Sequence, residues 1–420
     1  MVRYLRFRDP IGFKVHLILG CIALSLAPLW HAPSAVAFGI LAGYCLIRLP
    51  NTWRAYSAVL AEPAIVAWIL FGTLLATSVL WCPFGCGLGL DHLRAWRVML
   101  YPLLLLPVLP NHKALAASLV VGCVAQLALM LLTGEGRQGL EGMGPLRNVN
   151  LTGMWGAVLA TAGIAAVGFG RAWGVVMLCV GITTSLLSQS RGSLVSLGVG
   201  SITVIMSCAL RGPVHERWRR TGRACLVLLA ATLVGLAILP TAANRLRSGL
   251  STAAQRVTTI GDLRTIATSV DAERFLLWRF AATKAMDRPV VGWGFGSYPT
   301  MTTAVIDTFD RTWWSQPDDA ASLSSIGRHR GSHSMYLRVA CEQGLVGVAV
   351  LLAAVALTFK QLASLARTSG SAVAGLGILM AWLVYAATED AHTMTRALLP
   401  VPMVLTLVLL GDRLQTRNPS

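Results

Sequence analysis

Long apolar runs separated by short polar segments dominate the chain. Most runs hold about 17–25 mainly apolar residues, and each of these is long enough to cross about 30 Å of hydrocarbon as a helix. The pattern predicts an all-α polytopic membrane protein with about twelve transmembrane helices. They are expected near residues 15–31, 34–49, 60–81, 97–110, 114–133, 151–169, 173–189, 193–210, 224–240, 344–358, 372–389 and 398–411.

Basic residues gather in every second connection between these spans. Short cytoplasmic loops carry an excess of Lys and Arg, so the basic connections are assigned to the cytoplasm. Strict alternation over twelve spans then predicts a multi-pass protein of the inner membrane with both termini in the cytoplasm. The assigned residues are Arg3, Arg6, Arg8, Lys14, Arg48, Arg54, Lys113, Arg171, Arg211, Arg217, Arg219, Arg220, Arg223, Lys360, Arg367, Arg413 and Arg417.

The longest segment without a predicted span runs from 241 to 343 and faces the periplasm. It divides the chain into three parts: spans one to nine in 1–240, a periplasmic loop in 241–343, and three spans with a cytoplasmic tail in 344–420. Within the loop, 271–286 predicts a helix that ends before Pro289, because proline disfavours helix in the residue before it. A glycine-rich turn at 292–296, an irregular stretch to about 330 and a helix from near Ser332 should follow.

Composition narrows the class of protein further. The chain is 55% hydrophobic and only 13% charged, whereas soluble domains carry about 25% charged residues. The formal net charge of +17 would suggest nucleic acid in a soluble protein, but here the topology bias explains much of it, and no nucleic-acid partner is predicted. Twelve Lys and Arg in the long loop favour an anionic ligand, and the alternative is attraction to anionic lipid headgroups.

Common catalytic signatures are missing from the sequence. There is no Walker A loop for ATP, no HExxH motif and no Cys/His spacing typical of a metal site. Neither a cofactor nor a metal is therefore predicted.

Several polar residues remain at predicted periplasmic ends of spans, and each has a structural alternative. Arg191 is either functional or a helix-end arginine that reaches the interface. Arg274 is either functional or paired with a nearby acidic residue, and a lone His333 is more often structural than catalytic. Asn150 is a frequent type of helix cap. Glu389, Asp390 and His392 favour simple helix-end polarity over contact with a substrate.

The order of these groups is more specific than any one of them. An Asn opens a middle span, followed by Ser-Arg-Gly, Arg-x-x-x-Trp in the long loop, a glycine-rich turn, His-Ser-x-x-Leu and Glu-x-Gly-x-x-Gly. This order resembles the superfamily of O-antigen ligases and O-antigen polymerases over about 145–350. The matching residues are Asn150, Ser190, Arg191, Gly192, Arg274, Trp278, Gly292, Gly294, Gly296, His333, Ser334, Leu337, Glu342, Gly344 and Gly347.

The resemblance implies a GT-C-like membrane glycosyltransferase. Ligases of this superfamily transfer the O-antigen glycan from undecaprenyl diphosphate to lipid A–core in the periplasm, and their functional histidine and arginines match His333, Arg191 and Arg274. Ser334 stands where many relatives carry Asn. His333 is expected to act as general base, and the two arginines to stabilise the diphosphate in a metal-independent, inverting reaction. Further substrate contacts are expected from Arg147, Arg264, Arg288 and Asn150.

Two expectations and four alternatives accompany this hypothesis. Nearby arginines should lower the pKa of His333 and keep it neutral, and grooves between helices should hold the polyprenyl tail. An O-antigen polymerase or a protein O-oligosaccharyltransferase would use the same donor. A transporter of lipid-linked glycan is less favoured, because it predicts charges deep in several spans and often a repeat. A structural or sensing protein would not explain the periplasmic Arg and His set.

Overall fold

The computed structural model describes residues 9–29, 31–53, 56–132, 148–210, 214–238, 272–305 and 331–411. The described part of the chain is helical and contains no strand. Seven of its helical segments are long and apolar enough to cross a membrane, and three shorter apolar helices accompany them. The prediction of an all-α polytopic membrane protein is confirmed.

The elements follow one another with few long connections in the described ranges. Their bounds are α2 Pro10–Leu26, α3 His31–Thr52, α4 Ser57–Leu60, α5 Pro63–Ser78, η2 Val79–Trp81, α6 Gly87–Leu93, η3 Arg94–Leu100, α7 Tyr101–Leu105, η4 Leu106–Asn111, α8 His112–Leu132, α10 Val149–Gly168, α11 Trp173–Ser188, α12 Arg191–Leu210, α13 Val214–Ile238, α16 Ala272–Asp287, α17 Ser297–Val305, α19 Met335–Leu365, α20 Gly370–Thr388, η7 Ala391–Thr393, α21 Thr395–Leu398, α22 Pro400–Met403 and η8 Val404–Leu410.

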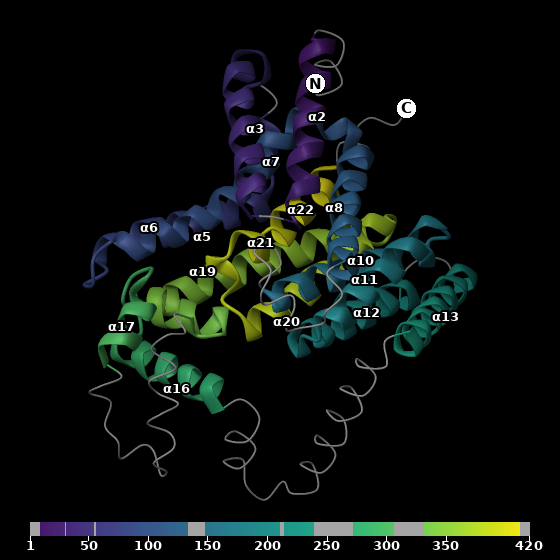
Figure 1. Ribbon diagram of the computed structural model, residues 1–420. Helices are drawn as coiled ribbons and strands as arrows, with labels where there is room; N and C mark the ends of the chain where they lie inside the picture. The colour runs from purple at the N-terminus through teal and green to yellow at the C-terminus, as the bar shows by residue number, and fades with distance from the viewer. Residues whose placement is uncertain are drawn as a thin grey trace, which may run out of the picture.

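The two spans predicted at 97–110 and 114–133 belong to one apolar run, Gly87–Leu132. This run is divided into α6, η3, α7, η4 and α8. Pro102 lies in α7, and Pro107 and Pro110 lie in η4. Proline lacks the backbone N–H that a continuing helix needs, so the run changes direction here, from α6 on one side of Figure 1 to α8 on the other.

The centre of the bundle is α10, which is buried along nearly its whole length. It packs against α11, α12 and α20. A methyl group on Gly156 would approach the Gly181 carbonyl oxygen to 2.7 Å, and one on Gly163 would approach the Gly174 carbonyl oxygen to the same distance. Small residues let helices approach closely in membranes, so these glycines fix the distance between α10 and α11.

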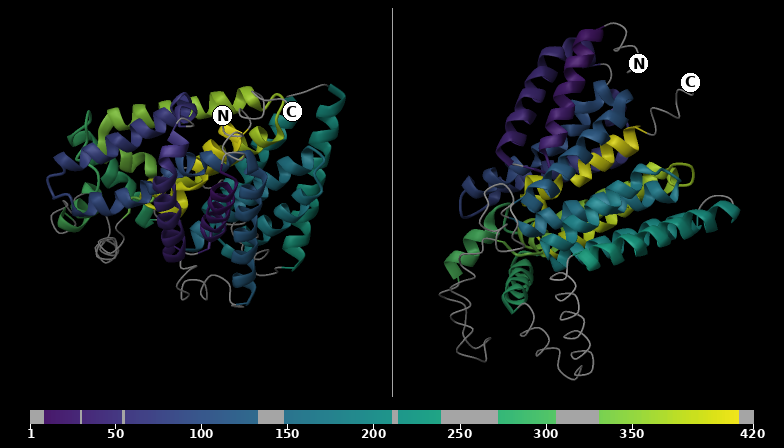
Figure 2. Two further views of the ribbon diagram at one scale, coloured as in Figure 1. Left: turned by 90° about the horizontal axis from the view of Figure 1, so that it is seen from above. Right: turned by 45° about the vertical axis from the view of Figure 1, so that its right-hand side comes forward.

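The bundle consists of two groups of helices (Figures 1 and 2). The helices α2, α3 and α8 form one group, while α10 to α13 and α20 form the other, with α5 packed along α19. The start of α2 and the end of η8 lie at the end of the molecule away from α16 and α17.

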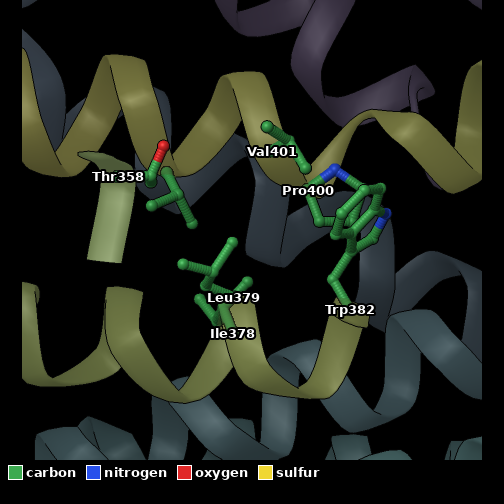
Figure 3. Close-up of a pocket in the computed structure, with 7 residues that line it drawn as sticks. Thr358, Ile378, Leu379, Trp382, Pro400 and Val401 are labelled. Atoms are coloured by element: carbon green, nitrogen blue, oxygen red, sulfur yellow. The ribbon is translucent and has the colours of Figure 1, made fainter. Parts of the chain in front are cut away.

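A tryptophan cluster joins α5, α19 and the last helices. The Trp68 indole N–H donates to Thr358 Oγ1 at 3.1 Å, and the Trp382 N–H donates to the Ala397 carbonyl at 2.7 Å. A narrow, mostly apolar pocket lies beside this cluster, between α19, α20, α22 and η8 (Figure 3). Its lining residues are Thr358, Ile378, Leu379, Trp382, Pro400, Val401 and Val404.

The segment after 271 contains both confirmed and missed elements. The helix predicted at 271–286 is confirmed as α16, ending at Asp287 before Pro289. The helix α17 is a miss, because Ser-Tyr-Pro-Thr-Met-Thr-Thr lacks the apolar periodicity that signals a helix. The helix expected near Ser332 begins at Met335 as α19. The stretch predicted to be irregular lies mostly outside the described residues.

Candidate active site

The glycine-rich turn lies against a break in α19. Gly344 has φ +63° inside that helix, so the regular hydrogen-bond ladder is interrupted there. The chain at 289–294 fills the break: the amides of 345 and 346 donate to the carbonyls of 289 and 290, and those of 293 and 294 donate to the carbonyls of 341 and 342, at 2.7–3.1 Å. Buried backbone groups need such partners, so this pairing holds α16 and α17 on the start of α19.

The glycines of the turn are required by geometry. Gly292, Gly294 and Gly296 have φ of +67°, +90° and +87°, a region that disfavours residues with a side chain. A methyl group on Gly294 would also lie 2.6 Å from the Ser78 carbonyl oxygen. The Phe295 amide then donates to Ser78 Oγ at 3.1 Å, so the turn docks on the end of α5.

Glu342 connects this turn to α17. Its Oε1 accepts the amide of Tyr298 at 3.1 Å, in the first turn of α17, and Arg338 Nε at 3.1 Å. A carboxylate at a helix N-terminus satisfies a free amide and matches the helix dipole. Glu342 therefore helps to fix the start of α17 beside α19.

The turn at 331–334 carries His333 just before α19. His333 has φ +50°, which is uncommon for a residue with a side chain and is found at functional sites. The Trp278 indole N–H donates to the His333 carbonyl at 3.2 Å. The Met335 amide donates to the Glu389 carbonyl at 3.1 Å. The turn is thus fixed between α16 and the segment after α20.

Glu389 joins three of the predicted site residues. Its Oε2 lies 3.2 Å from His333 Nδ1, and its Oε1 accepts Asn150 Nδ2 at 2.8 Å and an Arg274 guanidinium nitrogen at 3.3 Å. The Glu389 side chain is 7% exposed, whereas those of Arg274 and His333 are 26% and 29% exposed. One buried carboxylate therefore brings a histidine and an arginine together at a surface that a substrate can reach.

This carboxylate also sets the protonation of the histidine. The hydrogen bond with Glu389 raises the pKa of His333 above its usual value, against the opposing effects of burial and of Arg274. The expectation that the pKa of His333 is lowered overall is wrong: Arg274 does lower it, but the hydrogen bond with the Glu389 carboxylate outweighs this effect. A neutral ring that donates Nδ1–H to Glu389 carries its lone pair on Nε2.

Comparison with known protein families adds the decisive observation: residues 174–352 match the family model described as O-antigen ligase. This part of the chain is similar to the O-antigen ligase family. The resemblance inferred from motif order is confirmed over these residues. Among curated proteins, no sequence matches the chain.

The matched region, 174–352, contains Arg191, Arg274 and His333, while Asn150 and Glu389 lie outside it. The match supports a glycosyltransferase-like activity of the O-antigen ligase or polymerase type in a membrane protein of lipopolysaccharide biosynthesis. Within the described residues, no group of three or more His, Cys, Asp or Glu side chains is arranged to hold a metal ion.

The remaining predicted residues of this ligase-like site have different places. Arg191 opens α12 with an exposed side chain, and its neighbour Ser193 donates to the Asn150 carbonyl at 2.9 Å. Asn150 does not cap α10, since Asn148 does so by accepting the Leu151 amide at 2.9 Å. The start of α12, which carries Arg191, therefore lies against Asn150.

Arg288 does not join this cluster. Its guanidinium lies over the Trp293 ring, 4.1 Å from the centroid, just past the end of α16 opposite Arg274. Fourteen residues of helix separate the two positions by about 20 Å. Arg147 and Arg264 lie outside the described residues. The roles of all these arginines stay predictions.

Sequence reasoning missed two residues of this region. Arg338 and His92 contact each other at 3.0 Å. Arg338 falls between the His-Ser-x-x-Leu and Glu-x-Gly-x-x-Gly motifs without belonging to either, and His92 lies outside every motif. Glu389, Asp390 and His392 were considered and interpreted as helix-end polarity. The available signal was their charge: a Glu-Asp pair that ends an apolar span needs partners when it is buried.

Proposed function

We propose that this protein is an O-antigen ligase that transfers a glycan from undecaprenyl diphosphate to lipid A–core. The observation that carries the proposal is the Glu389 carboxylate, which holds His333, Arg274 and Asn150 within hydrogen-bond distance. These three residues come from segments far apart in the chain, and the sequence had already singled out each of them.

In this proposal, His333 is the general base. The acceptor hydroxyl must lose a proton as its oxygen attacks the anomeric carbon, and a positioned histidine contributes about 10²–10⁴-fold to such a step. With Nδ1 on Glu389, Nε2 receives the proton. The charged ring that forms is stabilised by the adjacent carboxylate, as in hydrolases that pair a histidine with an acid.

Arg274 and Arg191 are the proposed diphosphate contacts. As the new C1–O bond forms on one face of the sugar, the bond from C1 to the diphosphate oxygen breaks on the other, and undecaprenyl diphosphate leaves with the electron pair. Guanidinium groups stay protonated and match phosphate geometry, and one such contact is worth about 3 kcal/mol of barrier. Arg274 uses one guanidinium nitrogen for Glu389, and the group has further donors. Attack opposite the leaving group gives inversion.

The membrane side of the site follows from the basic connections. We place the active site on the periplasmic face of the inner membrane and both termini in the cytoplasm. The start of α2 and the end of η8 lie away from α16 and α17 (Figure 1), which supports this orientation. The polyprenyl chain would lie among the exposed apolar side chains of the bundle, in contact with membrane lipid.

The test is in vitro transfer by the purified full-length protein in EDTA, with undecaprenyl-diphosphate glycan and lipid A–core. We expect transfer by the wild type and its loss in His333→Ala, Arg191→Ala and Arg274→Ala. Glycan lengthening without core transfer would assign a polymerase, and transfer to a protein hydroxyl would assign an oligosaccharyltransferase. Flipping of the donor without transfer would overturn the enzyme proposal.

A further inference from the structure

A fully enclosed arginine lies behind the candidate site. Arg338, in the first turn of α19, is 1% exposed. Its Nε donates to Glu342 at 3.1 Å, one terminal nitrogen donates to Asp390 Oδ2 at 3.2 Å, and the other lies 3.0 Å from His92 Nδ1. All three guanidinium nitrogens therefore have partners, on three separate segments of the chain.

Asp390 links this arginine to the turn of His333. Its Oδ2 accepts the Ser332 amide at 2.8 Å, and its Oδ1 accepts the Ser332 hydroxyl at 2.6 Å. The Ser334 amide donates to Ser332 Oγ at 3.2 Å. Residues on both sides of His333 thus depend on one carboxylate, while the turn holds His333 at φ +50°.

The charges explain why an arginine is needed at this place. Two buried carboxylates, Glu342 and Asp390, face one guanidinium. Without the guanidinium, both would be uncompensated in a site of low dielectric constant. A lysine keeps the charge but is a compact point charge, so it cannot bridge two carboxylates and a ring as the planar fork does.

His92 extends the arrangement to α6. A guanidinium only donates hydrogen bonds, so His92 Nδ1 must be the acceptor and its ring must be neutral. The His92 ring also meets the Phe295 ring edge-on, with 5.8 Å between centroids. Arg338 therefore contacts the glycine-rich turn indirectly, through the same phenylalanine that docks on α5.

We propose that Arg338 is a positioning residue for His333, acting through Asp390 and Ser332 to hold the 331–334 turn in its strained conformation. The inference rests on the proposed function, because it assigns Arg338 a role in placing the general base. Arg338 does not touch the reacting atoms.

A matched control exists at the other end of the molecule. Arg48 is 4% exposed, pairs with Asp9 at 2.8 Å and lies 3.1 Å from His16 Nδ1. Like Arg338, it contacts an aspartate and a histidine Nδ1, but neither of these partners is a proposed site residue. Arg48→Lys therefore reports the general cost of disturbing a buried Arg–Asp–His group in this protein.

Kinetics form the first test. We expect Arg338→Lys to lower kcat for transfer by about 10²-fold, the cost of misplacing a catalytic group, with a much smaller change in KM for the donor. Arg48→Lys should keep kcat within about twofold of the wild type. Equal losses in the two variants would overturn the proposal, as would an unchanged kcat in Arg338→Lys.

Hydrogen exchange of the purified protein, read by mass spectrometry, tests the same link without activity. The amides of 332 and 334 should exchange faster in Arg338→Lys than in the wild type, and at the wild-type rate in Arg48→Lys. If Arg338→Lys is not recovered folded, Ser332→Ala replaces it, since this change removes the Ser332 hydroxyl but no charge. Unchanged exchange and kcat in Ser332→Ala would then overturn the proposal.

The pH profile separates positioning from mere support of the fold. Glu389 is the main cause of the raised pKa of His333, burial and Arg274 oppose it, and Asp390 adds a smaller upward effect. Asp390→Asn should therefore move the rising limb of kcat against pH slightly to lower pH as well as reduce its height. A reduced height with an unmoved limb would contradict the link. His333→Ala is measured alongside. If His333→Ala stays active, the proposed general base is wrong. If His333→Ala is inactive but Arg338→Lys has the kcat of the wild type, only the positioning role of Arg338 is rejected.

Discussion

Two buried arginines in this chain make nearly the same contacts, but only one of them adjoins a candidate active site. Arg48 and Arg338 each contact an aspartate and a histidine Nδ1. Arg48 lies on α3 and finds Asp9 and His16 around the neighbouring α2. Arg338 joins segments from three distant parts of the chain, and its aspartate, Asp390, accepts hydrogen bonds from Ser332 in the turn that carries a second histidine, His333.

The histidines show what the difference means. His16 is fully buried, and both ring nitrogens are occupied, Nδ1 by Arg48 and Nε2 by the Leu104 carbonyl at 2.7 Å. His333 is 29% exposed and rests on a carboxylate through Nδ1. A histidine serves catalysis when its environment fixes the ring but leaves it within reach of a substrate.

The largest expected effect separates these two histidines directly. His333→Ala should reduce transfer by roughly 10²–10⁴-fold, since the general base is lost. The measurement is initial rate with undecaprenyl-diphosphate glycan and lipid A–core. His16→Ala is the control and should keep the rate while lowering thermal stability. A His333→Ala enzyme as fast as wild type would remove the distinction.

The next effect concerns charge at the donor. If Arg274 contacts the leaving diphosphate oxygen as proposed, Arg274→Ala should lower kcat by about 10²–10³-fold, because that contact is lost in the transition state. Arg288→Ala, at the other end of α16, should stay within about threefold of wild type, since no such transition-state contact is lost. Equal losses in both would mean that α16 presents one continuous basic surface to the donor.

A third change tests how the histidine is tuned. Glu389→Gln should cost roughly 10²-fold in kcat through misplacement of the ring. Because Glu389 raises the pKa of His333, its loss should lower that pKa. A base works when deprotonated, so the rising limb of the rate against pH should move to lower pH. Asp9→Asn, which changes the carboxylate of the Arg48 group, should leave the profile in place.

The smallest effect is on stability and compares the backbones at the two ends. Gly294→Ala should destabilise the protein by about 2 kcal/mol from its positive φ, and further because the added methyl would approach the Ser78 carbonyl. Gly39→Ala in α3 meets no atom within 4 Å and should not lower the unfolding temperature. Thermal unfolding in detergent measures both, and equal values would contradict the strained geometry of the turn.

The hydropathy pattern predicted the helix bundle because backbone polar groups in lipid must be hydrogen-bonded within the protein. A long apolar run satisfies this requirement by itself when it forms a helix. The helix at α16 was predictable from its periodicity and from Pro289. The order of His333, Arg191 and Arg274 could be read as motifs because each lies in a polar connection, where charge has to be explained.

The rest depends on distances that sequence does not carry. Arg338 and His92 belong to no motif, and only the fold brings together these two residues, which are 246 positions apart in the chain. The sign of the His333 pKa shift was wrong for the same reason: arginines are more numerous in the loop, but the carboxylate of Glu389 is nearer. Arg288 was grouped with Arg274 by charge, although the helix between them holds the two apart.

The break in α19 at Gly344 also has a consequence for how the protein is made. The backbone that fills the break, 289–294, precedes 341–346 in the chain, so it has already been synthesised when α19 reaches the membrane. When the apolar helix α19 enters the membrane, the hydrogen-bond partners for the amides and carbonyls at its break are therefore already present. A circular permutant that begins at 331 would reverse this order and present the broken helix first, before any partner for it exists.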